Sequence, residues 1–242
     1  MNDFNQSYGA VGRETSTAVN TGLRSFMLGV YNKMALGLAL TAILAYAVGS
    51  NAQLTQTLLT GPLGMVVMFG PIAILLLSSF VMRNPSPLAA NAVYWSVVSL
   101  IGVGMGGLVY VYAGRPDGMV LVAKAFFTTS AAFAALSLWG YTTKRDLSGW
   151  GVFLFMGLIG VIIAMVVNMF VQSSMLGLIV SAVGVLIFAG LTAYDTQRLK
   201  EMYFQISGNT RAMAVATTYG ALSLYLNFIN MFQMLLSLMS RD

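Results

Sequence analysis

The sequence contains no cysteine and no histidine, and only 8% of its 242 residues are charged. The lack of cysteine excludes disulfides and thiolate catalysis, and the lack of histidine excludes imidazole acid–base chemistry and nearly every zinc or haem site. A bound metal would have to be held by oxygen ligands. We therefore expect no cofactor.

Hydrophobic residues, by contrast, make up 58% of the chain, and the mean hydropathy is +0.81. This composition leaves too little polar surface to cover a water-soluble globule. Apolar stretches of roughly 20 residues recur, and each is long enough to cross a hydrocarbon core about 30 Å thick as a helix. The sequence thus predicts an all-α integral membrane protein in the lipid bilayer, with seven transmembrane spans near residues 33–49, 61–82, 88–113, 119–141, 150–171, 176–194 and 214–239.

The last predicted span is the most polar of the seven. Polar side chains inside a membrane prefer to face other helices or water. We therefore expect a seven-helix bundle with its last helix at the centre. The residues that dilute this span are Thr217, Thr218, Ser223, Asn227, Asn230 and Gln233.

Two regions are expected. Residues 1–24 are polar and poor in aromatic side chains, which is typical of a flexible tail, and residues 25–242 form the transmembrane domain. No signal peptide is expected, because the first apolar run continues as a full span.

The net charge is +5, but the basic residues are scattered through short loops and form no patch for nucleic acid. Lys and Arg are retained on the cytoplasmic side of a membrane. The N-terminus is therefore predicted to be cytoplasmic, whereas the side of the C-terminus is left open, because a re-entrant last segment would reverse it. Basic residues on the predicted cytoplasmic side are Arg13, Arg24, Lys33, Arg83, Lys144, Arg145, Arg198, Lys200 and Arg211, and only Arg115 and Arg241 lie opposite.

Small residues mark the third span as a packing surface. Gly102 and Gly106 have the small-xxx-small spacing, and Gly104 and Gly107 lie beside them. Such residues let lipid-embedded helices approach closely. The pattern predicts helix packing and no cofactor site.

Asp195 is the one carboxylate within or bordering a predicted span, and it follows the sixth apolar run directly. At a helix C-terminus it would face the unfavourable end of the macrodipole, so a partner or a bound cation is expected. The alternative is an interfacial acid paired with Arg198 or Lys200. Arg83 is either a topological anchor or a partner for a carboxylate, and Lys124 is expected to snorkel to the outer interface.

Two segments resemble the signature of the Bax inhibitor-1 family, also called the transmembrane Bax inhibitor motif family. One is Ala193-Tyr194-Asp195-Thr196-Gln197, and the other runs from Leu222 through Leu224-Tyr225-Leu226 and Asn227-Phe228-Ile229 to Asn230. The resemblance covers nearly the whole chain after the tail, including the segment Lys144-Arg145-Asp146-Leu147-Ser148.

The resemblance implies a seven-helix fold with a central last helix and a pH-sensitive calcium leak. It also implies that Asp195 pairs with an acidic residue of the seventh helix, and that an Arg at the position of Arg83 latches the pair. This sequence has Asn227 where the family pattern has Asp. A carboxamide does not titrate, so the site would carry at most one negative charge, and Asp195 would be a weak calcium site at most.

The leading function is therefore a cation leak gated around Asp195, Asn227 and Arg83, with calcium as the permeant ion. The sequence leaves open whether Asn227 alters or abolishes flux. A second hypothesis is a regulatory protein that binds a membrane protease or another membrane complex. An enzyme is not expected, because the catalytic pairs of intramembrane proteases are missing. The short loops and the lack of an ER retrieval motif favour a bacterial inner membrane.

Overall fold

The structure is a computed structural model that describes the backbone of residues 3–82 and 84–240 and side chains from residue 20 onward. Eight helices form in the described part of the chain, and no strand does. Their bounds are α1 Asp3–Gly49, α2 Ala52–Leu59, α3 Gly61–Val81, α4 Pro87–Ala113, α5 Gly118–Thr142, α6 Ser148–Val171, α7 Ser174–Ile206 and α8 Thr210–Met239.

Seven of these helices are long and apolar enough to cross a membrane, which confirms the predicted all-α membrane bundle. In α1 the apolar part is Asn20–Gly49. The side chains before it lie outside the described ones, so the flexible tail stays a prediction.

The short helix α2 lies between the first two predicted spans, where a loop was expected. The side chain of Asn51 starts it by accepting the backbone N–H groups of Gln53 and Leu54.

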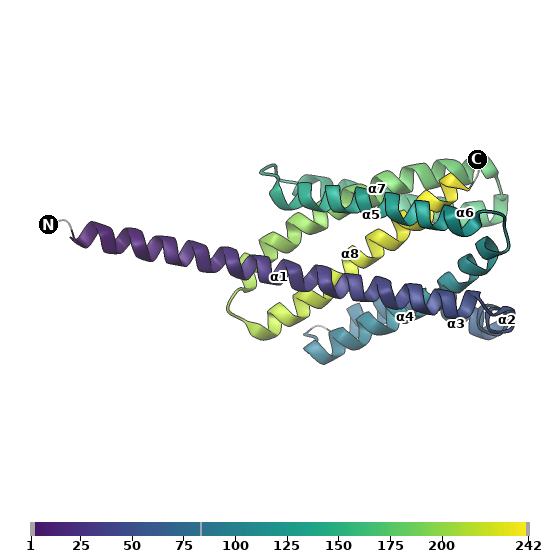
Figure 1. Cartoon of the computed structure of the whole chain (residues 1–242), viewed down its shortest axis with the longest axis horizontal. Coiled ribbons are helices and arrows are strands. Elements are labelled where there is room, and N and C mark those ends of the chain that lie inside the picture. The colour runs from purple at the N-terminus through teal and green to yellow at the C-terminus, as the bar shows by residue number, and fades with distance from the viewer. Residues whose placement is uncertain (1–2, 83, 241–242) are drawn as a thin grey trace.

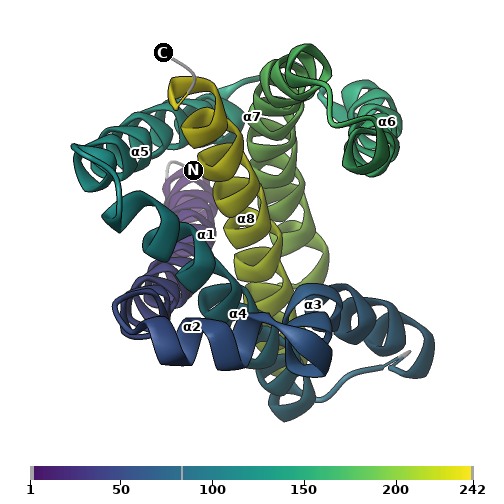
Figure 2. The same cartoon turned by 90° about the vertical axis from the view of Figure 1, so that its right-hand side faces the viewer.

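Helix α8 lies at the centre of the bundle, as predicted. It runs obliquely between the other helices and contacts α1, α4, α5 and α7 (Figures 1 and 2). In the most apolar 18-residue segment of α8, 56% of the residues are buried, which is the largest share among the seven spans. Helix α6 lies at the periphery against α7 (Figure 2). It exposes large apolar side chains such as Phe153 and Phe155. In a bilayer this face would meet lipid.

The glycines of α4 allow the close contact between α1 and α4. A Cβ atom at Gly106 would lie 2.6 Å from the Cβ of Val48, and one at Gly102 would lie 3.1 Å from the Cα of Thr41. Gly107 faces α2 instead, where a Cβ would lie 2.9 Å from Leu59. The prediction of a packing surface is thus confirmed for Gly102 and Gly106, which face the same helix.

Two predicted boundaries were wrong, and both lie at charged residues. The first span was expected to start at Lys33, but its apolar helix begins at Asn20 and carries Lys33 inside it. The sixth was expected to end at Tyr194, but α7 continues to Ile206. In both cases the charged side chain is bonded within the bundle and does not end the helix. The chain then reverses at Gly208, whose φ of +99° suits glycine.

Replacing Gly106 by valine should destabilise the bundle, because the added carbon atoms would overlap Val48 of α1. Overpacking of this kind costs about 1–3 kcal/mol. Thermal unfolding of the purified protein in detergent measures the loss. Gly160→Val is the matched control, because no atom lies within 4 Å of a Cβ at Gly160 on α6. An equal effect of both substitutions would contradict the packing role of Gly106.

Candidate functional site

Asp195 lies at the contact between α7 and the central helix α8. It lies on α7 with 8% of its surface exposed, and its Oδ2 accepts two hydrogen bonds from α8. The hydroxyl of Ser223 donates one at 2.6 Å, and the amide nitrogen of Asn227 donates the other at 2.8 Å. Asn227 is 5% exposed. Both donors are neutral, so they stabilise the carboxylate without cancelling its charge.

This geometry corrects the expected position of Asp195 at a helix end. Because α7 continues for eleven residues to Ile206, Asp195 lies about 16 Å from the C-terminus of its helix. The macrodipole acts mainly within the last turn, so it does not dominate here. The carboxylate instead meets its partners across the α7–α8 contact. Arg198, one turn further along α7, is exposed and lies close enough to act on the carboxyl through its charge.

The next residue of α7 joins two other helices. The hydroxyl oxygens of Thr196 and Ser137 are 2.9 Å apart, and the hydroxyl of Tyr31 lies 2.5 Å from that of Ser137. Thr196 is fully buried and Ser137 is 4% exposed. A chain of hydroxyl groups thus links α1, α5 and α7 beside Asp195. Hydrogen-bond chains of this kind hold helices in register inside a low-dielectric interior.

Gln197 fastens the loop between α5 and α6 to α7. Its carbonyl oxygen accepts the backbone N–H of Leu147 at 2.8 Å, and its amide donates to the carbonyl of Arg145 at 2.8 Å. Within this loop, hydrogen bonds from Ser148 hold the pKa of the exposed Asp146 carboxyl below its usual value. Consecutive residues of α7 from Asp195 to Gln197 therefore contact α8, α5 and the loop in turn.

A second polar cluster surrounds Lys33, which the sequence had suggested was only a topological signal. The ammonium group donates to the side chain of Asn91 on α4 and to the hydroxyl of Thr218 on α8 at 2.7 Å. It also lies 5.7 Å from the ring centre of Tyr94, whose hydroxyl donates to the carbonyl of Lys33 at 2.7 Å. These bonds allow a charged residue to lie inside an apolar span.

The structure brings together two of the three residues expected at the site. Asp195 and Asn227 are in direct contact, whereas Arg83 lies outside the described residues. Ser223 was missed, although its spacing of four residues from Asn227 places both on one face of α8. Lys124 is exposed on α5, where lipid would surround its stem.

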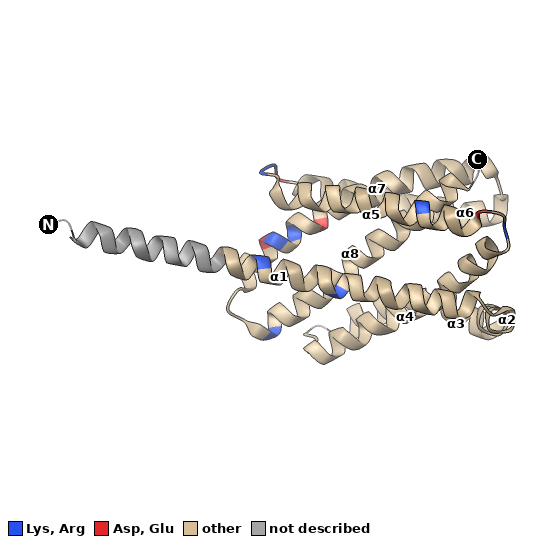
Figure 3. Cartoon of the chain, viewed as in Figure 1, with Lys and Arg blue, Asp and Glu red and all other residues tan. Residues whose placement is uncertain are grey.

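Most of the described basic residues lie toward one end of the bundle. Figure 3 shows them where α7 ends, where α8 begins and in the loop between α5 and α6, and the opposite end has few. This is the asymmetry from which a cytoplasmic N-terminus was predicted. The orientation itself stays a prediction.

The seven long apolar helices, with a charged side chain satisfied inside them, define a multi-pass membrane protein. Residues 23–242 match the family described as inhibitor of apoptosis-promoting Bax1. The chain belongs to this family, the Bax inhibitor-1 family, as its motifs had indicated.

Three bacterial relatives resemble the chain over most of their length. A protein of Caulobacter vibrioides is 50% identical over 248 residues, covering 98% of this chain and 97% of the relative. A protein of Rickettsia prowazekii is 39% identical, covering 87% of each chain. The inner membrane protein YbhL of Escherichia coli is 38% identical, covering 89% of this chain and 91% of YbhL.

Replacing Gln197 by alanine should loosen the loop between α5 and α6, because it leaves the N–H of Leu147 and the carbonyl of Arg145 without their partner. Leu147 is buried, and an unsatisfied buried N–H costs about 1–3 kcal/mol. Thermal unfolding in detergent should show this loss. Gln53→Ala serves as the control, because the Gln53 side chain is exposed. Unchanged stability of Gln197→Ala would show that the loop is not held by this side chain.

Proposed function

We propose that the protein forms a pH-sensitive cation leak across the membrane, with Asp195 as the titrating group that controls it. The observation that carries this proposal is a buried carboxylate inside a membrane-spanning bundle. Among the residues that the structure describes, its hydrogen-bond donors are two neutral side chains of the central helix. A charged group at this depth is expensive, so proteins retain one mainly where it has a function. Protonation of Asp195 would remove the charge and change the hydrogen bonds between α7 and α8.

A single carboxylate controls the leak differently from a pair. Two carboxylates in contact share a proton and titrate in two coupled steps. Helix α8 carries no Asp or Glu, so Asp195 titrates without an acidic partner on that helix. A leak controlled by one group should show a single titration step.

Calcium is the expected permeant ion, bound only weakly as it passes. Calcium sites usually provide six to eight oxygen ligands with several carboxylates. In the part of the chain that the structure describes, no three acidic residues come together. A site with so few acidic ligands favours the passage of calcium over its tight binding. Arg83 would act as the latch that neutralises Asp195 in the closed state.

The proposed location is the bacterial inner membrane, with the N-terminus in the cytoplasm. Similarity to YbhL supports the membrane, and the uneven distribution of Lys and Arg supports the orientation.

Replacing Asp195 by asparagine should lower calcium flux into proteoliposomes and abolish its dependence on pH between 5 and 8. Two unit charges 4 Å apart attract by about 4 kcal/mol at an effective dielectric constant of 20. Even a third of this attraction corresponds to about a tenfold change in rate. Flux measured with a trapped calcium dye, for wild type and variant in parallel, gives the comparison.

Asp117→Asn is the matched control for that experiment. It makes the same substitution at an exposed turn whose φ of +56° suits asparagine. Its flux should equal that of the wild type. Equal, pH-dependent flux in wild type and Asp195→Asn would rule out Asp195 as the control. If both the wild type and Asp195→Asn are folded and neither carries calcium flux, a regulatory interaction protein becomes the better hypothesis.

Replacing Asn227 by aspartate should restore a pair of carboxylates at the α7–α8 contact. Its side chain already lies 2.8 Å from the Oδ2 of Asp195, so two carboxylates there would share a proton. We expect stronger calcium flux and a broader, two-step dependence on pH. Flux measured at closely spaced pH values distinguishes one step from two. An unchanged curve would argue against control at this contact.

A further inference from the structure

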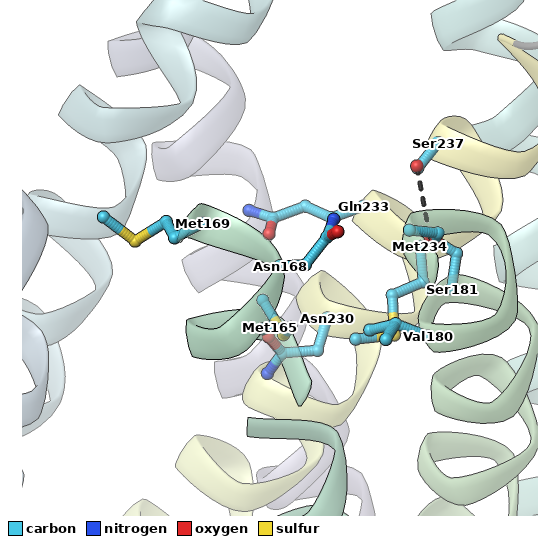
Figure 4. A pocket seen from close by; sticks show the side chains of 10 residues that line it. Met165, Asn168, Met169, Val180, Ser181, Asn230, Gln233, Met234 and Ser237 are labelled. Atoms are coloured by element: carbon cyan, nitrogen blue, oxygen red, sulfur yellow. Dashed lines mark hydrogen bonds between the residues drawn. The ribbon is translucent and has the colours of Figure 1, made fainter. Parts of the chain in front are cut away.

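A cavity of about 380 Å³ lies between α6, α7 and α8. It lies where α7 begins and α8 ends, whereas Asp195 lies toward the other end of the bundle. Among the described helices, α6 packs only on α7, so a crevice separates it from α8. Figure 4 shows Asn168 of α6 near Asn230 and Gln233 of α8, with Ser181 and Ser237 on the other side of the cavity. The two serine hydroxyls form a hydrogen bond of 3.2 Å.

The wall of this cavity exposes more apolar than polar surface, but its polar groups are several and none of them is charged. Three carboxamides and two hydroxyls line it together with methionine and valine side chains, and it contains no Asp, Glu, Lys or Arg. Such a surface offers oxygen atoms that can replace part of the hydration shell of an ion. It does not bind the ion tightly, because no full negative charge is present.

The polar part of the wall on α8 continues along that helix to the site around Asp195. Ser223, Asn227, Asn230, Gln233 and Ser237 follow one another at intervals of four, three, three and four residues. These intervals keep all five on one face of the helix. Ser223 and Asn227 bind Asp195, and the other three line the cavity. One polar stripe therefore joins the cavity to the buried carboxylate.

The depth of the carboxamides indicates what fills the cavity. Gln233 and Asn230 lie six and nine residues before Met239, the last residue of α8, which is about 9 Å and 13 Å along the helix axis. Gln233 is exposed although its nitrogen donates to the sulfur of Met105. A polar group left in hydrocarbon costs several kcal/mol. Water, which can bond such groups, is therefore a better occupant than a lipid chain.

We propose that this cavity is a water-filled vestibule through which small hydrated cations approach Asp195 along the stripe of α8. The inference rests on the proposed leak and adds its entrance. The stripe becomes buried within one turn, since Asn227 is 5% exposed and Asp195 is 8% exposed. The closed section thus lies between Asn230 and Asn227. With the predicted orientation, the vestibule opens to the outside of the cell.

The absence of cysteine from the chain makes the test direct, because each introduced thiol is the only one. Gln233→Cys and Asn230→Cys are compared with Met231→Cys and Ile163→Cys in proteoliposomes. Met231 lies between the two stripe positions and is fully buried, and Ile163 on α6 is 58% exposed on an apolar surface that would meet lipid. A cationic, membrane-impermeant methanethiosulfonate reagent is added on both sides of the membrane, and mass spectrometry measures labelling.

We expect both stripe thiols to react at least about tenfold faster than the two controls. The thiolate, which forms in water, attacks the sulfur of the reagent to form a mixed disulfide, and methanesulfinate leaves. Elution as a single folded species is required of each variant. Rates at the stripe positions no higher than at Ile163→Cys would mean that lipid or protein fills the crevice, which overturns the proposal.

A second measurement separates the entrance from the leak itself. Labelling of Gln233→Cys with the cationic reagent should lower calcium flux, and the same treatment of Met231→Cys should not. Rapid labelling without any effect on a measurable flux would overturn the role of the vestibule as the entrance. If the wild type carries no calcium flux at all, the proposed leak is contradicted. The labelling rates would still decide whether the cavity holds water.

Discussion

The fold depends on the inability of lipid to form hydrogen bonds. Each polar group that a transmembrane helix buries must find its partner within the protein. In the part of the chain that the structure describes, no buried side-chain nitrogen or oxygen lacks one. Asp195 imposes the strongest demand, because an ionised carboxylate needs donors and α8 provides two. The most polar helix therefore lies at the centre, with apolar helices between it and lipid.

The seven spans could be predicted because length and hydropathy follow directly from the thickness of a bilayer. Their ends could not, where a charged residue lies inside a helix. Lys33 and Asp195 both resembled boundaries, since an isolated charge is costly in hydrocarbon. Each is bonded to helices distant in sequence, Lys33 to α4 and α8 and Asp195 to α8. Hydropathy along one segment contains no information about such partners.

The candidate site was predictable in part. Asn227 was matched to Asp195 through the family resemblance, and the structure brings the two into contact. Ser223, Ser137 and Tyr31 were not identified, because their contacts depend on how each helix is rotated and where it crosses its neighbours. The glycines of α4 were easier, since small residues indicate close packing wherever they lie in a membrane helix.

The continuity of α7 gives the buried carboxylate a mechanical connection to the protein surface. Asp195 and Gln197 lie two residues apart on one uninterrupted helix, and Gln197 holds the loop that carries Lys144 and Arg145. A helix moves as a rod, so a rotation of α7 at the carboxylate also turns the anchor of this loop. If Asp195 takes up a proton as proposed and α7 rotates, the positive charges of this loop would change position at the protein surface.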